Sequence, residues 1–386
     1  MRKTEIKHIN RIKIAFCFLF GLILFPSNIK SLIIIVTGIL VLVNFFMNNN
    51  KFDKKYFISN SFYFLILLST IFYSNNLNIA SLKIQTMLSL VAFPLMFSLL
   101  NYKDKQVLLS FIFKYLWIYI IGVCLYNVIP FLWFYSTIPN YSFLGMSYHF
   151  KNFIIHDIGK YGIHPIYMSM HCCLAILFSL KLFLTNKKRY EKVLLLILNL
   201  ILFFFLLMYA RKGPIIAFIV TLFTWSYLEN KKYFKYNLLF IFSLIILFSM
   251  IPTTRNRFLE LTKIEKATVD KPSSSNIRYT IYGNSLNLIK QAPLFGYGIG
   301  DFQEELRKTY KKNASFLLKG TYNSHNQYIS FLLIGGIVLF FAFIFFYIKH
   351  FILAIQAKNK ILILITCLIL SGKGSSIKKP KYSVFK

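Results

Sequence analysis

The stretch VLLLILNLILFFFLLMYARKGPIIAFIVTLFTWSYL, residues 193–228, sets the fold class of this protein. It contains two apolar runs, 193–209 and 213–228, and between them a short turn with Arg211 and Lys212. Apolar runs of roughly 17 to 25 residues cross the hydrocarbon core of a bilayer as helices. We therefore expect two membrane helices joined by a charged turn.

The composition extends this expectation to the whole chain. Of its 386 residues, 57% are hydrophobic and 15% are charged, whereas about a quarter of the residues in soluble domains are charged. The apolar runs predict an all-α, polytopic integral membrane protein with about 11 transmembrane helices. Their expected spans are 14–26, 31–47, 57–73, 82–100, 107–133, 163–184, 193–209, 213–228, 237–252, 326–348 and 361–371.

The charged and cysteine residues exclude several classes of protein. The net charge is +33, but the basic residues separate the apolar runs and form no basic domain, so we expect no nucleic-acid partner. Cys172 and Cys173 are adjacent and the other cysteines are dispersed, so no disulfide framework is expected. The N-terminus resembles a signal peptide, but it has no small-x-small cleavage site, and we read it as the first membrane helix.

The distribution of Lys and Arg predicts the orientation. Every second segment that connects two predicted spans, such as 187–192 and 231–235, is rich in Lys and Arg. The short connecting segments on the other side of the membrane contain few basic residues. The positive-inside rule then places the N-terminus in the cytoplasm and residues 253–325 outside. We expect membrane helices 1 to 9 in 1–252, an extracytoplasmic loop with a surface helix in 253–325, and C-terminal membrane helices with a basic tail in 326–386.

One part of the long outer loop has a helical pattern. Apolar residues recur at helical spacing within 276–291, as at Ile277, Ile281 and Leu288. Pro293 would end the helix. We expect an amphipathic helix on the outer membrane surface, with Arg278 in its first turn.

Two arginines on the outer side are candidates for binding an anion. Arg211 lies in the turn after span 193–209, where the topological bias disfavours positive charge, and Arg278 lies on the surface helix. Guanidinium groups bind phosphate oxygens through paired hydrogen bonds, so both would suit a diphosphate. The structural alternatives are that Arg211 extends to lipid headgroups and that Arg278 meets lipid phosphates or water.

His325 stands at the mouth of an apolar helix, in NSHNQYISFLLIGG, residues 323–336. With an unperturbed pKa of about 6.5, a histidine can take a proton from a hydroxyl at neutral pH. The structural alternative is an interfacial histidine that bonds a loop carbonyl. The outer loops also contain carboxylates that could act as a base, and Asp301, just after GYGIG, is the best placed of these.

These motifs together resemble the O-antigen ligase and polymerase superfamily. The resemblance rests on YARKGP at the outer end of a span, on APLFGYGIGDF in a long outer loop, and on SHNQYISFLLIGGIVLFF. It extends from about Gly162 to Ile348, and HPIYMSM, residues 164–170, looks like the segment that opens a membrane helix in many such proteins.

The resemblance implies an enzyme of the bacterial cytoplasmic (inner) membrane that uses no metal or other cofactor. It would move a glycan from an undecaprenyl diphosphate carrier to an acceptor hydroxyl on lipid A core or on a growing glycan. Arg211 and Arg278 correspond to arginines that hold the diphosphate, and His325 to the histidine that activates the acceptor, with inversion. Further substrate contacts are expected from Lys212, Asn326, His164, Tyr167 and Asp301.

Other functions remain open. A polysaccharide polymerase would use the same donor, and the shared motifs do not separate it from a ligase. A transporter of lipid-linked sugars would favour broken polar helices near the membrane midplane and an internal repeat, and neither is clear. A membrane scaffold would make the Arg and His arrangement a coincidence.

Two further patterns in the sequence are weaker: a series of spaced histidines and a short last apolar run. His149, His156, His164 and His171 recur at near-regular steps, but no Cys or carboxylate at ligand spacing completes a metal site, so none is expected. The last apolar run, 361–371, is too short to cross a bilayer comfortably, and the basic residues after it depart from the family pattern. We expect a shortened, re-entrant or interfacial end.

Overall fold

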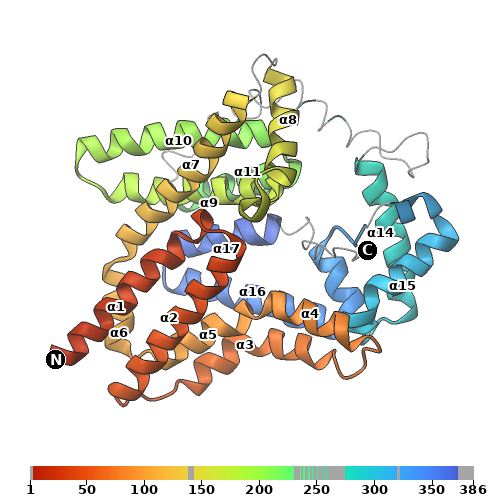
Figure 1. Cartoon of the computed structure of the whole chain (residues 1–386), viewed down its shortest axis with the longest axis horizontal. Helices are drawn as coiled ribbons and strands as arrows, with labels where there is room; N and C mark the ends of the chain where they lie inside the picture. Colours follow the sequence, from red (N-terminus) through yellow and green to blue (C-terminus); the bar gives the residue numbers. More distant parts are fainter. Residues whose placement is uncertain are drawn as a thin grey trace. The chain divides into compact units, whose positions relative to one another are not determined.

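The computed structural model describes residues 3–137, 143–229, 274–319 and 322–372, with single residues between 230 and 273. Within these ranges every regular element is an α-helix or a short 3-10 helix (Figure 1), as the all-α class predicts. The chain divides into two compact units. Unit 1 comprises Met1–Asn60, Leu90–Arg255 and Ala354–Leu368, and unit 2 comprises Ser61–Ser89, Asn256–Leu353 and Ile369–Lys386.

The described helices include several that can cross a membrane. Two helices joined by a bend of 45°, α4 (Leu77–Met87) and α5 (Ser89–Leu99), form one candidate. Five others are long and apolar enough by themselves, so this is a multi-pass membrane protein with five or six candidate spans in the described part. The expected total of about eleven spans stays a prediction. The five are α2 (Ser27–Met47), α7 (Ile112–Thr137), α9 (Pro165–Thr185), α10 (Arg189–Tyr209) and α16 (Gln327–Gln356).

Other predicted spans form helices that are shorter or more polar. α3 (Lys54–Ser69) has 16 residues and α17 (Lys360–Gly372) has 13, fewer than the ~20 that cross hydrocarbon. α1 (Lys3–Phe20) includes the basic N-terminal residues, and the apolar part of α11 (Lys212–Glu229) is Lys212–Trp225. The predicted span 237–252 falls mostly, and the basic tail after Gly372 wholly, outside the described residues.

The remaining elements connect or cover these helices. They are η1 (Leu22–Leu24), α6 (Tyr102–Ser110), α8 (Phe143–His156), η2 (Gly159–Tyr161), α14 (Ser274–Gln291), α15 (Gly298–Asn313) and η3 (Ser315–Lys319).

Unit 1 is built around a helical hairpin. α9 and α10 are joined by residues 186–188, and α7 and α11 pack against α9 (Figure 1). Two polar residues of α7 bond across this apolar core. The Asn127 side-chain oxygen accepts from the Tyr209 hydroxyl at 2.6 Å, and the Tyr126 hydroxyl donates to the Tyr161 carbonyl at 2.7 Å. Because unpaired polar groups are costly in an apolar interior, these bonds fix both segments to α7.

In unit 2 the predicted loop helix is confirmed, and a second helix follows it. α14 covers Ser274–Gln291, close to the expected 276–291, and ends before Pro293. The segment GYGIG, residues 296–300, contains the first residues of α15. α14 packs against α15 (Figure 1), and Asn313 donates to the Asn284 side-chain oxygen at 3.1 Å. Part of the amphipathic face of α14 is therefore covered by protein.

The apolar helix α16 is broken at two glycines, Gly335 and Gly336, whose backbone angles are not helical. The loop 292–297 fills the break. Pro293 and Leu294 accept from the N–H groups of Ile337 and Val338 at 2.9 and 3.5 Å. A side chain on Gly336, which has φ 59°, would overlap the Leu294 carbonyl, so the loop can approach only a glycine there.

Candidate functional site

The first group of candidate residues lies in unit 1, at the turn between α10 and α11. Ala210 ends α10 with φ 44° and donates its N–H to the Leu206 carbonyl. Arg211 follows, and Lys212 begins α11; both side chains are half-buried. The first N–H groups of a helix have no partner within the helix and carry its positive dipole end. The turn therefore combines two cations with a helix N-terminus, which suits an anion.

His164 and Tyr167 lie at the same end of the α9–α10 hairpin. His164 caps α9 by accepting the Ile166 N–H on Nδ1 at 3.3 Å, and its ring lies 6.2 Å from that of Tyr167. Tyr126 and Asn127, neighbours on α7, bond the segment just before His164 and the end of α10, respectively. The structure thus places these two predicted residues near the Arg211 turn.

The second group lies in unit 2, around His325. Its φ of 49° is in the left-handed region, which costs roughly 1–2 kcal/mol for a residue with a Cβ. Its N–H donates to the Asn323 side-chain oxygen at 2.9 Å. Asn326 caps α16 by accepting the Tyr328 N–H at 2.9 Å. The ring of Tyr322 lies 5.8 Å from the His325 ring.

Three further hydrogen bonds hold the His325 loop in place, and none of them was predicted from the sequence. The Ser324 hydroxyl is buried, lies 2.5 Å from the Ser330 hydroxyl and donates to the Asn326 carbonyl at 3.1 Å. Gln303, on α15, donates to the Tyr322 carbonyl at 2.8 Å. No local pattern marks Gln303, because its partner is in a different segment of the chain.

Arg278 is the fifth residue of α14 and is half-buried. It belongs to the same unit as His325. The helix that carries it is fixed by the α14–α15 packing, so α15 contacts both the helix of Arg278 and, through Gln303, the loop of His325.

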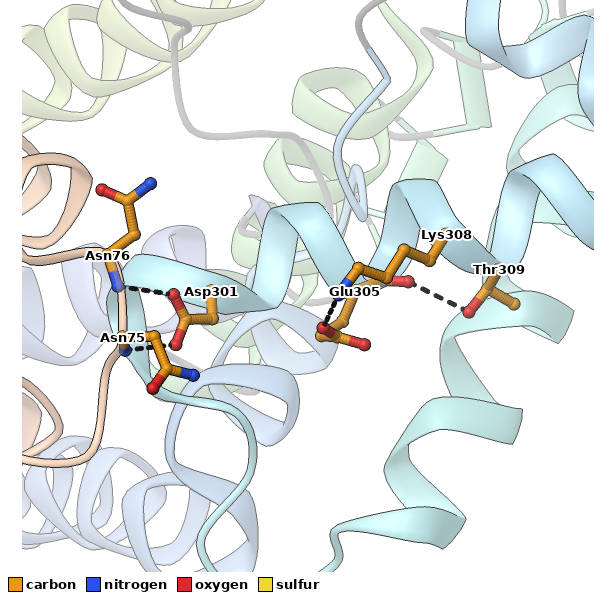
Figure 2. A network of polar contacts seen from close by, with 6 residues as sticks. All are labelled: Asn75, Asn76, Asp301, Glu305, Lys308 and Thr309. Atoms are coloured by element: carbon orange, nitrogen blue, oxygen red, sulfur yellow. Dashed lines mark hydrogen bonds and ion pairs between the residues drawn. The ribbon is translucent and has the colours of Figure 1, made fainter.

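Asp301 holds a turn of the protein. Its two carboxylate oxygens accept the backbone N–H groups of Asn75 and Asn76 at 2.6 and 2.9 Å (Figure 2). It is 9% exposed. Hydrogen bonds to an ionised acceptor are stronger than neutral ones, so Asp301 ties the α3–α4 turn to the start of α15. Its predicted contact with substrate stays a prediction.

The surroundings of Asp301 strengthen this junction. The Gly300 N–H donates to the Ser74 hydroxyl at 3.1 Å, and the Lys83 ammonium donates to the Ile299 carbonyl at 3.0 Å while lying 4.0 Å above the Phe302 ring.

A separate ion pair lies farther along α15. Lys308, which is exposed, and Glu305, which is half-buried, lie 2.7 Å apart (Figure 2). The hydrogen bond to Glu305 raises the pKa of Lys308. An exposed pair of this kind stabilises a helix little.

The histidine series is accounted for in part by other contacts. The His171 ring lies 2.6 Å from the Tyr119 hydroxyl, and His164 caps α9. Within the residues that the structure describes, no group of three or more His, Cys, Asp or Glu side chains could hold a metal ion. That the enzyme works without a metal stays a prediction.

Comparison with known proteins agrees with the predicted resemblance. Residues 197–344 match the family described as O-Antigen ligase. The matched segment contains Arg211, Lys212, Arg278, Asp301, His325 and Asn326, whereas His164 and Tyr167 precede it. No curated protein matches the chain. The family implies glycan transferase activity on lipid-linked glycans. The chain is therefore a multi-pass membrane protein, and its residues 197–344 are similar to the O-antigen ligase family.

Proposed function

We propose that this protein is a glycosyltransferase of the ligase type. It moves a glycan from an undecaprenyl diphosphate carrier to an acceptor hydroxyl on lipid A core or a similar molecule, at the outer side of the bacterial cytoplasmic membrane. One observation carries the proposal: the segment that matches the O-antigen ligase family includes Arg211, Arg278 and His325. Inversion, metal independence and the acceptor are parts of the proposal.

Arg211 and Arg278 hold the diphosphate in this scheme. Each guanidinium offers paired donors to phosphate oxygens, and Lys212 adds a point charge. The start of α11, directly after Arg211, adds the positive end of its helix dipole to the same anion. Negative charge develops on the diphosphate as it leaves, and groups already positioned for that charge often make the largest catalytic contribution.

His325 takes the proton of the acceptor hydroxyl. The hydroxyl oxygen then forms a bond to the anomeric carbon while the bond to the diphosphate breaks on the opposite face, which inverts the configuration. The left-handed backbone of His325 supports this role, because strained non-glycine residues cluster at active sites. Further substrate contacts are assigned to Asn326, His164, Tyr167 and Asp301.

The contact between Asn75–Asn76 and Asp301 supports the proposed orientation. These residues belong to two segments that the positive-inside rule places outside, and the hydrocarbon core of about 30 Å would separate segments on opposite sides. The contact requires only that the two segments lie on the same side, and the positive-inside rule makes this the outer side and the N-terminus cytoplasmic. The division into membrane helices in 1–252, an outer loop in 253–325 and a C-terminal part in 326–386 belongs to the same proposal.

In the test, cells that lack the gene are complemented with wild type or with the His325→Asn variant. Asn tolerates the left-handed conformation as histidine does, so His325→Asn removes the base and keeps the turn. We expect its transfer rate to fall by about 10²–10⁴-fold, the range for loss of a general base. Surface glycans are compared on gels, at equal membrane levels of wild type and variant.

The outcomes separate the candidate functions. Restored long glycans on the lipid acceptor with wild type, and their loss with His325→Asn, support the ligase proposal. If cells without the gene carry a single repeat unit on the acceptor, the protein is a polymerase. Full complementation by His325→Asn would show that the imidazole is structural and would overturn the mechanism.

A further inference from the structure

The two parts of α16 differ in their surroundings. Before the break, residues 327–336 include no exposed side chain, and Leu333 and Ile334 are 0% exposed. From Ile337 onward, exposed apolar side chains recur at every fourth residue, with Ile337 41%, Phe341 59% and Phe345 60% exposed. Residues at this spacing lie on one face of a helix. On a candidate membrane span, such a face meets acyl chains.

The loop that fills the break lies at the start of this exposed face. Pro293 and Leu294 bond the N–H groups of Ile337 and Val338, the first exposed residues after the break. Leu294 and Phe295 are themselves 59% and 62% exposed. Exposed apolar side chains of α16 and of the loop are therefore joined directly through these backbone hydrogen bonds.

Several backbone groups of the loop, including the carbonyls of residues 292–295, are paired within the protein. The Phe295 carbonyl accepts from the Tyr73 hydroxyl at 2.8 Å, the Ala292 carbonyl from the Gly296 N–H at 3.2 Å, and the Tyr297 N–H donates to the Leu333 carbonyl at 2.8 Å. On a loop exposed to water, these polar backbone groups could instead form hydrogen bonds with water. Non-helical backbone at membrane depth persists only where protein or trapped water pairs its polar groups.

We propose that Leu294 and Phe295 form a wedge that inserts among the acyl chains of the bilayer beside the break in α16. The partner is bilayer lipid, because the wedge adjoins the exposed apolar face of a membrane span and lies on a loop in which the carbonyls of residues 292–295 are paired within the protein. α14 leads directly into the wedge, so the wedge also fixes that helix at the membrane surface. This inference is independent of the catalytic mechanism.

A single tryptophan at the wedge tests the proposal. The native residues Trp117, Trp133 and Trp225 are first replaced by Phe. Phe295→Trp is then compared with Glu304→Trp, a matched control at an exposed position of α15. Both proteins are reconstituted into phosphatidylcholine vesicles with or without brominated acyl chains. We expect brominated lipid to remove most of the emission of Phe295→Trp and little of the emission of Glu304→Trp.

If the wedge is in lipid, aqueous iodide quenches the emission of Glu304→Trp more than that of Phe295→Trp. Quenching of Phe295→Trp by iodide, with no response to brominated lipid, would overturn the proposal. So would relief of the bromine quenching on addition of undecaprenyl phosphate, which would assign the wedge to a polyprenyl chain. Leu294→Trp repeats the measurement if Phe295→Trp does not accumulate in the membrane, and the same outcomes apply to it.

Discussion

The turn at Ala210 and the turn at His325 both place a residue with a Cβ in the left-handed region, and they do so for different reasons. Ala210, with φ 44°, ends α10, and the candidate Arg211 comes after it. At the second turn the left-handed residue is His325 itself, with φ 49°. At the first turn the unfavourable conformation belongs to Ala210, a neighbour of the candidate residue. At the second turn it belongs to the candidate residue itself.

The difference separates a structural from a functional use of the same conformation. Glycine adopts the end of a helix such as α10 without the Cβ penalty, so nothing in the Ala210 conformation needs a methyl group. The His325 conformation is held by Asn323 and by the bonds of Ser324. The histidine side chain is retained where glycine would be less strained, which points to a role for the imidazole.

After the loss expected for His325→Asn, the next largest effect is expected from the guanidinium at the first turn. Arg211→Lys keeps the charge and loses the paired donors, and hydrogen bonds to charged groups contribute about 1.5–3 kcal/mol. We expect transfer to slow by about ten- to hundred-fold on that basis. The rate is measured with lipid-linked donor in proteoliposomes. Arg189→Lys, at the exposed opposite end of α10, is the control, and an unchanged rate for Arg211→Lys would remove the diphosphate from this turn.

A smaller effect, on stability, is expected in the unit that contains His325. Asp301→Asn replaces a carboxylate that accepts two backbone N–H groups with a side chain that has one acceptor oxygen. We expect the free energy of unfolding of this unit to fall by about 1.5–3 kcal/mol, seen as a lower Tm in detergent. Glu304→Gln, exposed on the same helix, should leave the Tm unchanged. Equal melting of Asp301→Asn and wild type would show that the carboxylate does not hold the α3–α4 turn.

The smallest effect is expected from Ala210→Gly. Relief of the left-handed penalty, roughly 1–2 kcal/mol, is offset by about 0.4–1 kcal/mol of added chain entropy in the unfolded state. Stability should change by about 1 kcal/mol or less, and transfer should continue at the wild-type rate. His325→Gly relieves the same backbone strain and should abolish transfer. If Ala210→Gly also abolishes it, the two turns do not differ as we infer.

The sequence predicted some elements well because their signals are local. α14 has apolar residues at helical spacing and a proline shortly after its end, and its observed bounds lie within two residues of the expected ones. The α10–α11 turn was placed by the two apolar runs around it. The resemblance to the ligase family named residues that the matched segment contains, although their catalytic roles stay predictions.

Other features depend on contacts between distant segments. Gly300 is the third residue of α15, and a Cβ on it would lie 2.5 Å from the Asn76 carbonyl oxygen. The close approach of a distant segment therefore requires glycine at this position. The expected span 326–348 combined a first part without exposed side chains and a second part, after Gly336, in which exposed residues such as Phe341 alternate with buried ones such as Phe343. Hydropathy responds equally to buried and exposed apolar residues and so predicted one continuous span, although the Gly335–Gly336 pair marks the break.

The break in α16 also has a consequence for the order of assembly. The carbonyls of Pro293 and Leu294, which pair the N–H groups of Ile337 and Val338, come earlier in the chain than the helix that needs them. A ribosome makes the chain from its N-terminus, so residues 293–297 leave it before α16 does. When the second part of α16 enters the membrane, the groups that complete its first turn have already been synthesised.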